Sequence, residues 1–321
     1  MISLPDACRH VLEHNLAIDP GESVVIVSDG TRPQFVSAFE RGARALEARV
    51  SIVEIPEPEY NGQEPPADAA TAMRKANVVL MPLARSLSWT VARREATAAG
   101  ARIASMPYIT EEIALRTFPV DYRPIRERAN EWCDRLDRGM SVHITTASGT
   151  DLTLGIDDRE AHGRKGGIYR SPGHWGNLPC GEAFIAPVEG SAHGVYVVDA
   201  SQAGVGKVEQ PIRITVENGL AVRIEGGADA TKLDETLRRV NDPRAYNIAE
   251  LGIGCNHAAR IIGVTLEDEK ALDTCHIALG RNDLFGGTVD VGIHLDGIVR
   301  RPRIRIDNED YSGSDCREEA V

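Results

Sequence analysis

The sequence predicts an α/β N-terminal domain with a parallel, doubly wound sheet over residues 1–139, followed by a mostly β, α+β domain over residues 140–321. Before residue 140, short apolar runs alternate with amphipathic helical stretches. This alternation is typical of a parallel sheet with helices on both faces. After residue 140, runs of alternating apolar residues are separated by tight turns, which is typical of antiparallel strands.

The first half is expected to contain four buried strands with helices between them. The N-terminal stretch MISLPDACRHVLEHNL predicts an amphipathic helix. Strands are predicted at residues 23–29, 49–56, 76–82 and 101–107, and further helices at 33–48 and 88–100. The turn SDGTRP after the first strand has one glycine where a dinucleotide fingerprint needs three, so no nucleotide cofactor is expected.

The second half is expected to begin with two hairpins, residues 141–156 and residues 211–226 around Asn218-Gly219,. A helix follows at 228–241, with Asp229 or Thr231 as the N-terminal cap. The stretch GIHLDGIV contains Asp296-Gly297, which is either a hairpin turn or the end of a strand at a functional site. The polar tail, residues 307–321, is expected to be loose.

Composition excludes several classes of protein. The net charge of −12 argues against nucleic acid and against an anionic membrane surface as partners,. No apolar run approaches the ~20 residues of a membrane-spanning helix. The six cysteines form no CxxC pair, so neither a zinc knuckle nor a disulfide scaffold is indicated, and a cytoplasmic location is expected.

The second half also holds ionisable residues inside apolar, strand-like segments. They are Glu182 in GEAFIAPV, Glu250 in AELGIG, His276 in CHIALG, and His294 with Asp296 in GIHLDG. Each alone is better explained as a hydrogen-bonded core residue or a solvated strand end. Together they predict a metal site, because buried carboxylates need a compensating cation and mixed His and carboxylate ligands suit zinc, manganese, cobalt or iron.

A Gly- and Pro-rich stretch from residue 168 to residue 194 is the least regular part of the chain. It contains His174 beside Trp175. Irregular segments that carry ionisable residues are common sites of function. His174 is therefore a candidate acid or base in a substrate pocket.

Four motifs in order, NLPCGEAFIAPVEGSAHG, AELGIGCN, HIALGRND and GIHLDGIVRRP, resemble the metallopeptidase family of aminopeptidase T and aminopeptidase S. The resemblance covers most of residues 177–305. It implies a homodimeric hydrolase of an amide or peptide bond, with two zinc, manganese or cobalt ions that activate a shared water. The metal ligands would be Glu182, Glu250, His276, His294 and Asp296, with Glu182 also moving the proton.

One departure from that family concerns the substrate. The peptidases carry a tyrosine seven positions after the histidine of the HxAxG motif, and this chain has Asp283 there. A carboxylate would repel the oxyanion that a phenol can stabilise. The expected substrate is therefore a small amide rather than a peptide, with Asp283 as a helper acid, a ligand or only a turn residue.

The alternative is a ring-cleaving dioxygenase, because the HLD stretch also resembles the 2,5-dihydroxypyridine dioxygenases. That resemblance implies one ferrous ion held by two histidines and a carboxylate. His294 and Asp296 would provide two ligands, and His276 or His257 the third. A non-catalytic binding protein is the third hypothesis, and the presence of all the predicted ligands disfavours it.

Overall fold

Residues 2–312 are described by the computed structural model of the chain. They divide into two compact units. The first contains the residues up to Pro124 together with Lys165–Cys180, and the second contains Ile125–Arg164 and the residues from Gly181 onward. Among the described residues, no helix is both long enough and apolar enough to cross a membrane.

The first unit is built on a five-stranded, all-parallel sheet with the order β2-β1-β3-β4-β7. Its elements are α1 (Leu4–His10), a π-helix (Val11–Asn15), β1 (Ser23–Ser28), α2 (Pro33–Ala45), β2 (Arg49–Glu54), α3 (Ala67–Lys75), β3 (Val78–Met81), α4 (Val91–Ala98), β4 (Arg102–Ser105), α5 (Glu111–Thr117) and β7 (Trp175–Asn177). This confirms the predicted α/β class.

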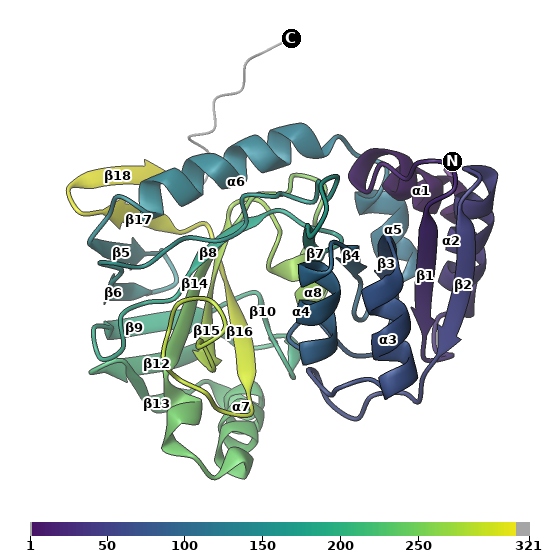
Figure 1. Cartoon of the computed structure of the whole chain (residues 1–321). Helices are drawn as coiled ribbons and strands as arrows, with labels where there is room; N and C mark the ends of the chain where they lie inside the picture. Colours follow the sequence, from purple (N-terminus) through teal and green to yellow (C-terminus); the bar gives the residue numbers. More distant parts are fainter. Residues whose placement is uncertain (1, 313–321) are drawn as a thin grey trace. The chain divides into compact units, whose positions relative to one another are not determined.

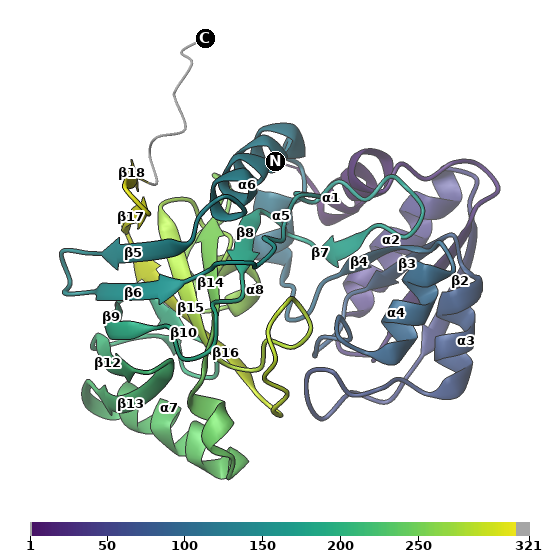
Figure 2. The ribbon, with the colours of Figure 1, turned by 60° about the vertical axis from the view of Figure 1, so that its left-hand side comes forward.

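Helices cover both faces of this sheet, as Figures 1 and 2 show. The α3 and α4 helices pack side by side on one face through Met73, Ala92 and Ala96. The α1, α2 and α5 helices pack together on the other face, where Phe39 of α2 lies beside Phe118. The α1 helix begins with a capping box, in which the hydroxyl of Ser3 accepts a hydrogen bond from the backbone N–H of Asp6,.

Two features of the first sheet differ from the expectation. The β2 strand is exposed or half-buried along its whole length because it is an edge strand with a single neighbour, β1. The β7 strand comes from the Gly- and Pro-rich stretch and was not predicted. Only three residues long, it pairs with β4, and Ile103 donates a hydrogen bond to the carbonyl of His174 at its start.

The second unit contains two antiparallel sheets, one with the order β11-β10-β16-β15-β14-β8 and one with the order β13-β12-β9-β6-β5-β17-β18. Its helices are α6 (Tyr122–Leu136, which groups here from Ile125), α7 (Gly227–Val240), a 3-10 helix (Pro243–Tyr246) and α8 (Thr265–Asp268). Its strands are β5 (Ser141–Thr145), β6 (Asp151–Gly155), β8 (Glu182–Ile185), β9 (His193–Val198), β10 (Ser201–Gln202), β11 (Gly206–Lys207), β12 (Ile212–Glu217), β13 (Leu220–Glu225), β14 (Ile248–Gly254), β15 (Thr274–Gly280), β16 (His294–Arg300), β17 (Arg303–Ile306) and β18 (Glu309–Ser312).

One hydrophobic core joins the two sheets of the second unit. The six-stranded sheet contributes Ile185, Leu251 and Ile277, and the seven-stranded sheet contributes Leu152 and Ile214. Residues of α6 and α7 complete this core. Because side chains alternate between the faces of a strand, the residues between these apolar positions point away from the core. That second face of the six-stranded sheet carries the predicted ligands.

Several local predictions for the second unit are confirmed. Both hairpins form, and Asn218 and Gly219 both adopt positive φ, at 49° and 76°, as a two-residue turn between right-twisted strands requires. The predicted helix is α7, but neither Asp229 nor Thr231 caps it. Its N-cap is Gly226, without a side-chain hydrogen bond.

The stretch GIHLDGIV neither turns at Asp296-Gly297 nor ends a strand. His294 begins β16, which continues through both residues to Arg300. Glycine is needed at 297 because a Cβ there would lie 2.6 Å from Val198 and 2.8 Å from Gln202. Within the tail, residues 309–312 form β18 and are not loose. Residues 313–321 lie outside the described part of the chain.

The division into units differs in two places from a single boundary after residue 139. The α6 helix groups with the second unit from Ile125, and residues 165–180 return to the first unit, where they supply β7.

Candidate metal centre

Four neighbouring strands of the six-stranded sheet place ionisable side chains on one face. Glu182 comes from β8, Glu250 from β14, His276 from β15, and His294 with Asp296 from β16. The ladder puts Glu182 opposite Gly254, His276 opposite Gly252, and Asp296 opposite Ala278. Directly opposed residues share a face of an antiparallel sheet. The five residues therefore lie on the face that points away from the hydrophobic core.

Small residues between these side chains leave the room that they need. Ala278 separates Glu250 from Asp296 in one cross-strand row. In the next row, the ring of His276 lies over Gly252, where an added Cβ would be 1.9 Å from His276 Nε2. The glycines and alanine of the GIG and HIALG motifs therefore have a physical role, which is to let long polar side chains lie across the sheet.

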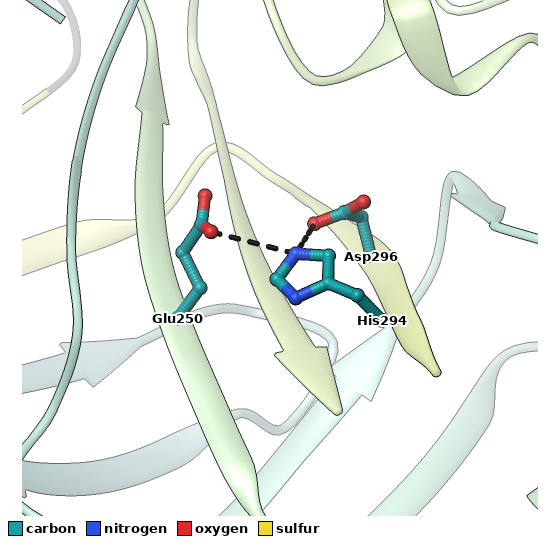
Figure 3. Close-up of side chains that lie close together, drawn as sticks. All are labelled: Glu250, His294 and Asp296. Atoms are coloured by element: carbon teal, nitrogen blue, oxygen red, sulfur yellow. Dashed lines mark ion pairs between the residues drawn. The ribbon is translucent and has the colours of Figure 1, made fainter. Parts of the chain in front are cut away.

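Glu250, His294 and Asp296 form the most compact group. Each offers one ligand atom, and these atoms lie within 4.8 Å of one another. His294 Nε2 is 3.4 Å from a carboxylate oxygen of Glu250 and 3.4 Å from Oδ1 of Asp296. Figure 3 shows the two carboxylates on either side of the imidazole. Glu250 and Asp296 are each 7% exposed, so this charge is largely removed from water.

His276 adjoins this group and is completely buried. Its Nε2 lies 3.2 Å from Oε1 of Glu250 and 3.7 Å from Oε2 of Glu182. The structure therefore brings together all five residues that the sequence singles out as ligands. Their roles as ligands remain predictions.

The backbone fixes the orientation of His294. Its Nδ1 lies 2.8 Å from the carbonyl oxygen of Arg281. In the neutral imidazole, which is the form that binds a metal, a hydrogen bond to that carbonyl places the proton on Nδ1 and leaves the lone pair on Nε2, on the side of the two carboxylates. Asp283 does not join the cluster; it forms an ion pair with Arg281 at 2.5 Å. This ion pair stabilises the segment that contains Arg281, whose carbonyl oxygen orients His294.

Lys270 and Glu269, just after α8, are part of the same cluster and were not predicted. Lys270 is fully buried, with its Nζ 2.5 Å from Oε1 of Glu182 and also ion-paired with Glu269. The sequence LEDEKALD predicts only a short helix, and four consecutive charged residues are usually solvated. Here Glu267 and Asp268 are also buried, because their carboxylates accept backbone N–H groups of residues 260–263.

The charges of the cluster raise the pKa values of its histidines, and burial raises that of Glu269. Burial alone would lower the pKa of His276, but the hydrogen bond with Glu250 and the charges of Asp296 and Glu182 raise it to about 9. Burial opposes protonation of His294 in the same way, and Asp296 and Glu250 raise its pKa well above the usual value. Burial raises the pKa of Glu269 to about 8. The carboxylates thus attract positive charge to this face of the sheet.

Two other candidates are not among the residues of these groups. His174 belongs to the first unit, immediately before β7, and its role as an acid or base stays a prediction. His257, the alternative third ligand, is exposed in the turn after β14. The metal-ligand group found among residues 2–312 does not include it.

The donor set fits a divalent cation. Imidazole nitrogen and carboxylate oxygen converge without cysteine, as at zinc, manganese or non-haem iron sites. Buried carboxylates at this spacing repel one another unless a cation lies between them. The fold and the site therefore define a two-unit protein with a candidate metal centre on one face of an antiparallel sheet.

Comparison with known proteins identifies the family. The sequence profile of the 2,5-dihydroxypyridine 5,6-dioxygenases matches residues 3–312, and the chain belongs to this family. The 2,5-dihydroxypyridine 5,6-dioxygenase of Pseudomonas putida is 25% identical over 332 aligned residues, which cover 94% of this chain and 92% of that protein.

Two solved structures share the fold over nearly the whole chain. The 2,5-dihydroxypyridine dioxygenase of Pseudomonas putida KT2440 superposes with a TM-score of 0.82 at 23% identity, covering 97% of this chain and 96% of the other. Wild-type AmpT from Thermus thermophilus gives a TM-score of 0.69 at 19% identity, covering 96% of each chain. The aminopeptidase relationship is thus one of fold.

These comparisons correct the main functional interpretation of the sequence. A hydrolase of an amide or peptide bond is wrong, since the profile and the Pseudomonas relative both specify a dioxygenase. The alternative drawn from the HLD stretch is the one they support. The chain is still an enzyme, as expected, but of a different class.

Proposed function

We propose that this protein is a metal-dependent dioxygenase that opens the ring of a small hydroxylated pyridine of the 2,5-dihydroxypyridine type. The observation that carries the proposal is family membership over residues 3–312 in a chain that gathers histidine and carboxylate donors on one sheet face. Ring-cleaving dioxygenation needs a redox-active metal, and a ferrous ion suits a mixed imidazole and carboxylate set.

We further propose that His294, Asp296 and Glu250 hold one ferrous ion. His276 is 3.2 Å from Glu250 and is the histidine that would complete a set of two histidines and one carboxylate. A bound ferrous ion would supply the one-electron chemistry that dioxygen requires. The protein's part is to fix the donor atoms, to keep His294 in the tautomer set by the Arg281 carbonyl, and to limit the access of water.

An aromatic cluster next to His294 supports a flat aromatic substrate. The ring of Phe285 stands edge-on to the imidazole of His294, with 5.9 Å between the ring centroids. Phe184, on the same strand as Glu182, packs against Phe285 at 5.6 Å, and His162 stacks beside Phe184 at 5.3 Å. Aromatic rings pack favourably against one another edge to face or offset-stacked, so this cluster is suited to contact an aromatic substrate.

Oxygen uptake tests the proposal. The full chain, loaded anaerobically with Fe(II), is mixed with 2,5-dihydroxypyridine in an oxygen electrode while the ring absorbance is followed. We expect one dioxygen consumed per ring lost, and both atoms of ¹⁸O₂ in the product. Protein that retains iron but consumes no oxygen with this substrate or with other dihydroxypyridines would refute the proposal.

A pair of conservative variants tests the third ligand. Glu250→Gln is expected to abolish iron retention, whereas His276→Gln should weaken iron binding without abolishing it. Loss of iron in His276→Gln with retention in Glu250→Gln would assign the third position to His276 instead.

Location and assembly also remain proposals. The cysteines Cys8, Cys133 and Cys275 are free and buried, which supports a reducing, cytoplasmic compartment. A homodimer is proposed only on the resemblance to the aminopeptidases, and light scattering on the purified chain would test it.

A further inference from the structure

A positively charged side chain already lies inside the acidic cluster. Lys270 is 0% exposed, and it is among the largest fully buried side chains of the protein. Burying an ammonium group is strongly unfavourable unless carboxylates pair with it. Its position beside the candidate metal ligands therefore needs an explanation.

The ammonium group binds two carboxylates. Lys270 Nζ is 2.5 Å from Oε1 of Glu182 and is also paired with Glu269. The other oxygen of Glu182, Oε2, is 3.7 Å from His276 Nε2. One oxygen of Glu182 is thus already paired with a protein cation.

The remaining donors form a separate group. Glu250, His294 and Asp296 converge within 4.8 Å, with no atom of Glu182 among them. Glu250 bridges towards both histidines through its two oxygens, 3.2 Å from His276 and 3.4 Å from His294. The face therefore has two cation positions, of which one is filled by a lysine and the other is lined by metal-type donors.

We infer that Lys270 is a built-in counter-cation that takes the place of a second divalent ion and restricts the cluster to one metal. Glu182 is on this account a partner of the lysine rather than a ligand of the metal. The inference rests on the proposed function and gives a structural reason for its single ion, and it assigns Lys270 and Glu182 as positioning residues.

Counting bound Mn²⁺ tests the inference without reference to turnover. The full chain is stripped with a chelator under argon and titrated with Mn²⁺, and the free ion is followed by electron paramagnetic resonance. We expect one ion in the wild type, two in Lys270→Met, and one in Lys270→Arg, which keeps the charge. Lys270→Met combined with Glu182→Gln should return to one, because the second position then lacks its carboxylate.

The outcomes separate this inference from the proposed function. The difference of one ion between Lys270→Met and the wild type reports on the lysine, while the wild-type count reports on the metal centre. A folded Lys270→Met that takes up no more ions than the wild type, or a wild type that takes up two, would overturn the inference. A wild type that takes up none would overturn the proposed metal centre, and one ion in Lys270→Met would then still support the role of the lysine.

Glu182→Gln in the wild-type background covers the case in which Lys270→Met does not fold. If Glu182 belongs to the lysine, this isosteric variant retains one Mn²⁺. If Glu182 is a ligand of the metal, the variant loses that ion and the inference is wrong. Circular dichroism of each variant confirms that the counts refer to folded protein.

Discussion

At the scale of single residues, the sequence is informative where a charge interrupts an apolar run. Glu250, His276 and Asp296 could be recognised in this way, because apolar residues or glycine flank each of them directly. Lys270 could not, since a run of charged residues normally indicates a solvated helix. Its burial depends on an ion pair with Glu182, which is 88 positions away in the sequence (270 − 182). It also depends on backbone N–H groups that donate hydrogen bonds to the carboxylates of Glu267 and Asp268.

His294 provides the first prediction at this scale. His294→Ala removes the imidazole that lies between Glu250 and Asp296, at 3.4 Å from each. Changing even a residue that only orients a ligand costs ~10–100-fold in metal affinity, so we expect the loss of the ligand itself to cost more than ~100-fold. Isothermal titration of the stripped protein with Mn²⁺ measures it.

His143→Ala is the matched control. His143 belongs to the same unit but is paired with the exposed Asp151, on the seven-stranded sheet. Its removal should leave the Mn²⁺ affinity unchanged. An equal loss in both variants would indicate a general effect on folding rather than a ligand.

At the scale of elements, the regular strands and the hairpins were predictable and the irregular connections were not. The run SVVIVS is apolar enough to identify β1, and Asn218-Gly219 identifies the β12–β13 turn. The β7 strand has three half-buried residues, WGN, and only its pairing with β4 makes it a strand. The dipeptide Asp296-Gly297 does not predict its own structure, because the same two residues can form a hairpin turn or lie inside a strand. Here the close packing at Gly297 explains the glycine within β16.

Gly252 connects strand packing to the metal centre. Gly252→Ala adds a Cβ 1.9 Å from His276 Nε2, so the imidazole must leave its place over β14. We expect a loss of ~1–3 kcal/mol in the free energy of unfolding, as for other overpacked sites, together with weaker Mn²⁺ binding. Urea denaturation and titration measure the two effects.

Gly292→Ala is the control for this prediction, since a Cβ there meets nothing within 4 Å. It should change neither quantity appreciably. Unchanged Mn²⁺ binding in Gly252→Ala would show that the position of the His276 ring is not needed for the metal.

The turn between β12 and β13 gives a prediction about stability alone. Asn218 has φ 49°, a left-handed conformation that costs an alanine ~1–2 kcal/mol. Asn218→Ala should therefore lower the free energy of unfolding by ~1 kcal/mol, whereas Asn218→Gly should lie within ~0.5 kcal/mol of the wild type. Equal loss in both variants would mean that the side chain, not the backbone conformation, stabilises this turn.

At the scale of the whole molecule, the fold could be predicted but the reaction could not. The same two-unit architecture superposes on a dihydroxypyridine dioxygenase and on AmpT, and fold alone does not determine chemistry. Ligand types left both one and two metals open, because the sequence does not show which carboxylates are already paired. The buried pair of Lys270 with Glu182 is the kind of contact that decides this, and only the structure contains it.

Removal of the metal is the test at this scale. Because all the proposed ligands belong to the second unit, binding should stabilise the strands that carry them, by ~2.7 kcal/mol when the free ion is at 100 times its dissociation constant. Hydrogen–deuterium exchange of the Mn²⁺-loaded and stripped chain should show faster exchange on stripping in β14, β15 and β16. The parallel strands β1, β3 and β4 serve as an internal control, with exchange expected to change much less.

If instead the strands of both units lost protection equally, the effect of the metal would be on the stability of the whole chain. If no strand changed, the ions would be bound outside this sheet and the proposed metal centre would be wrong.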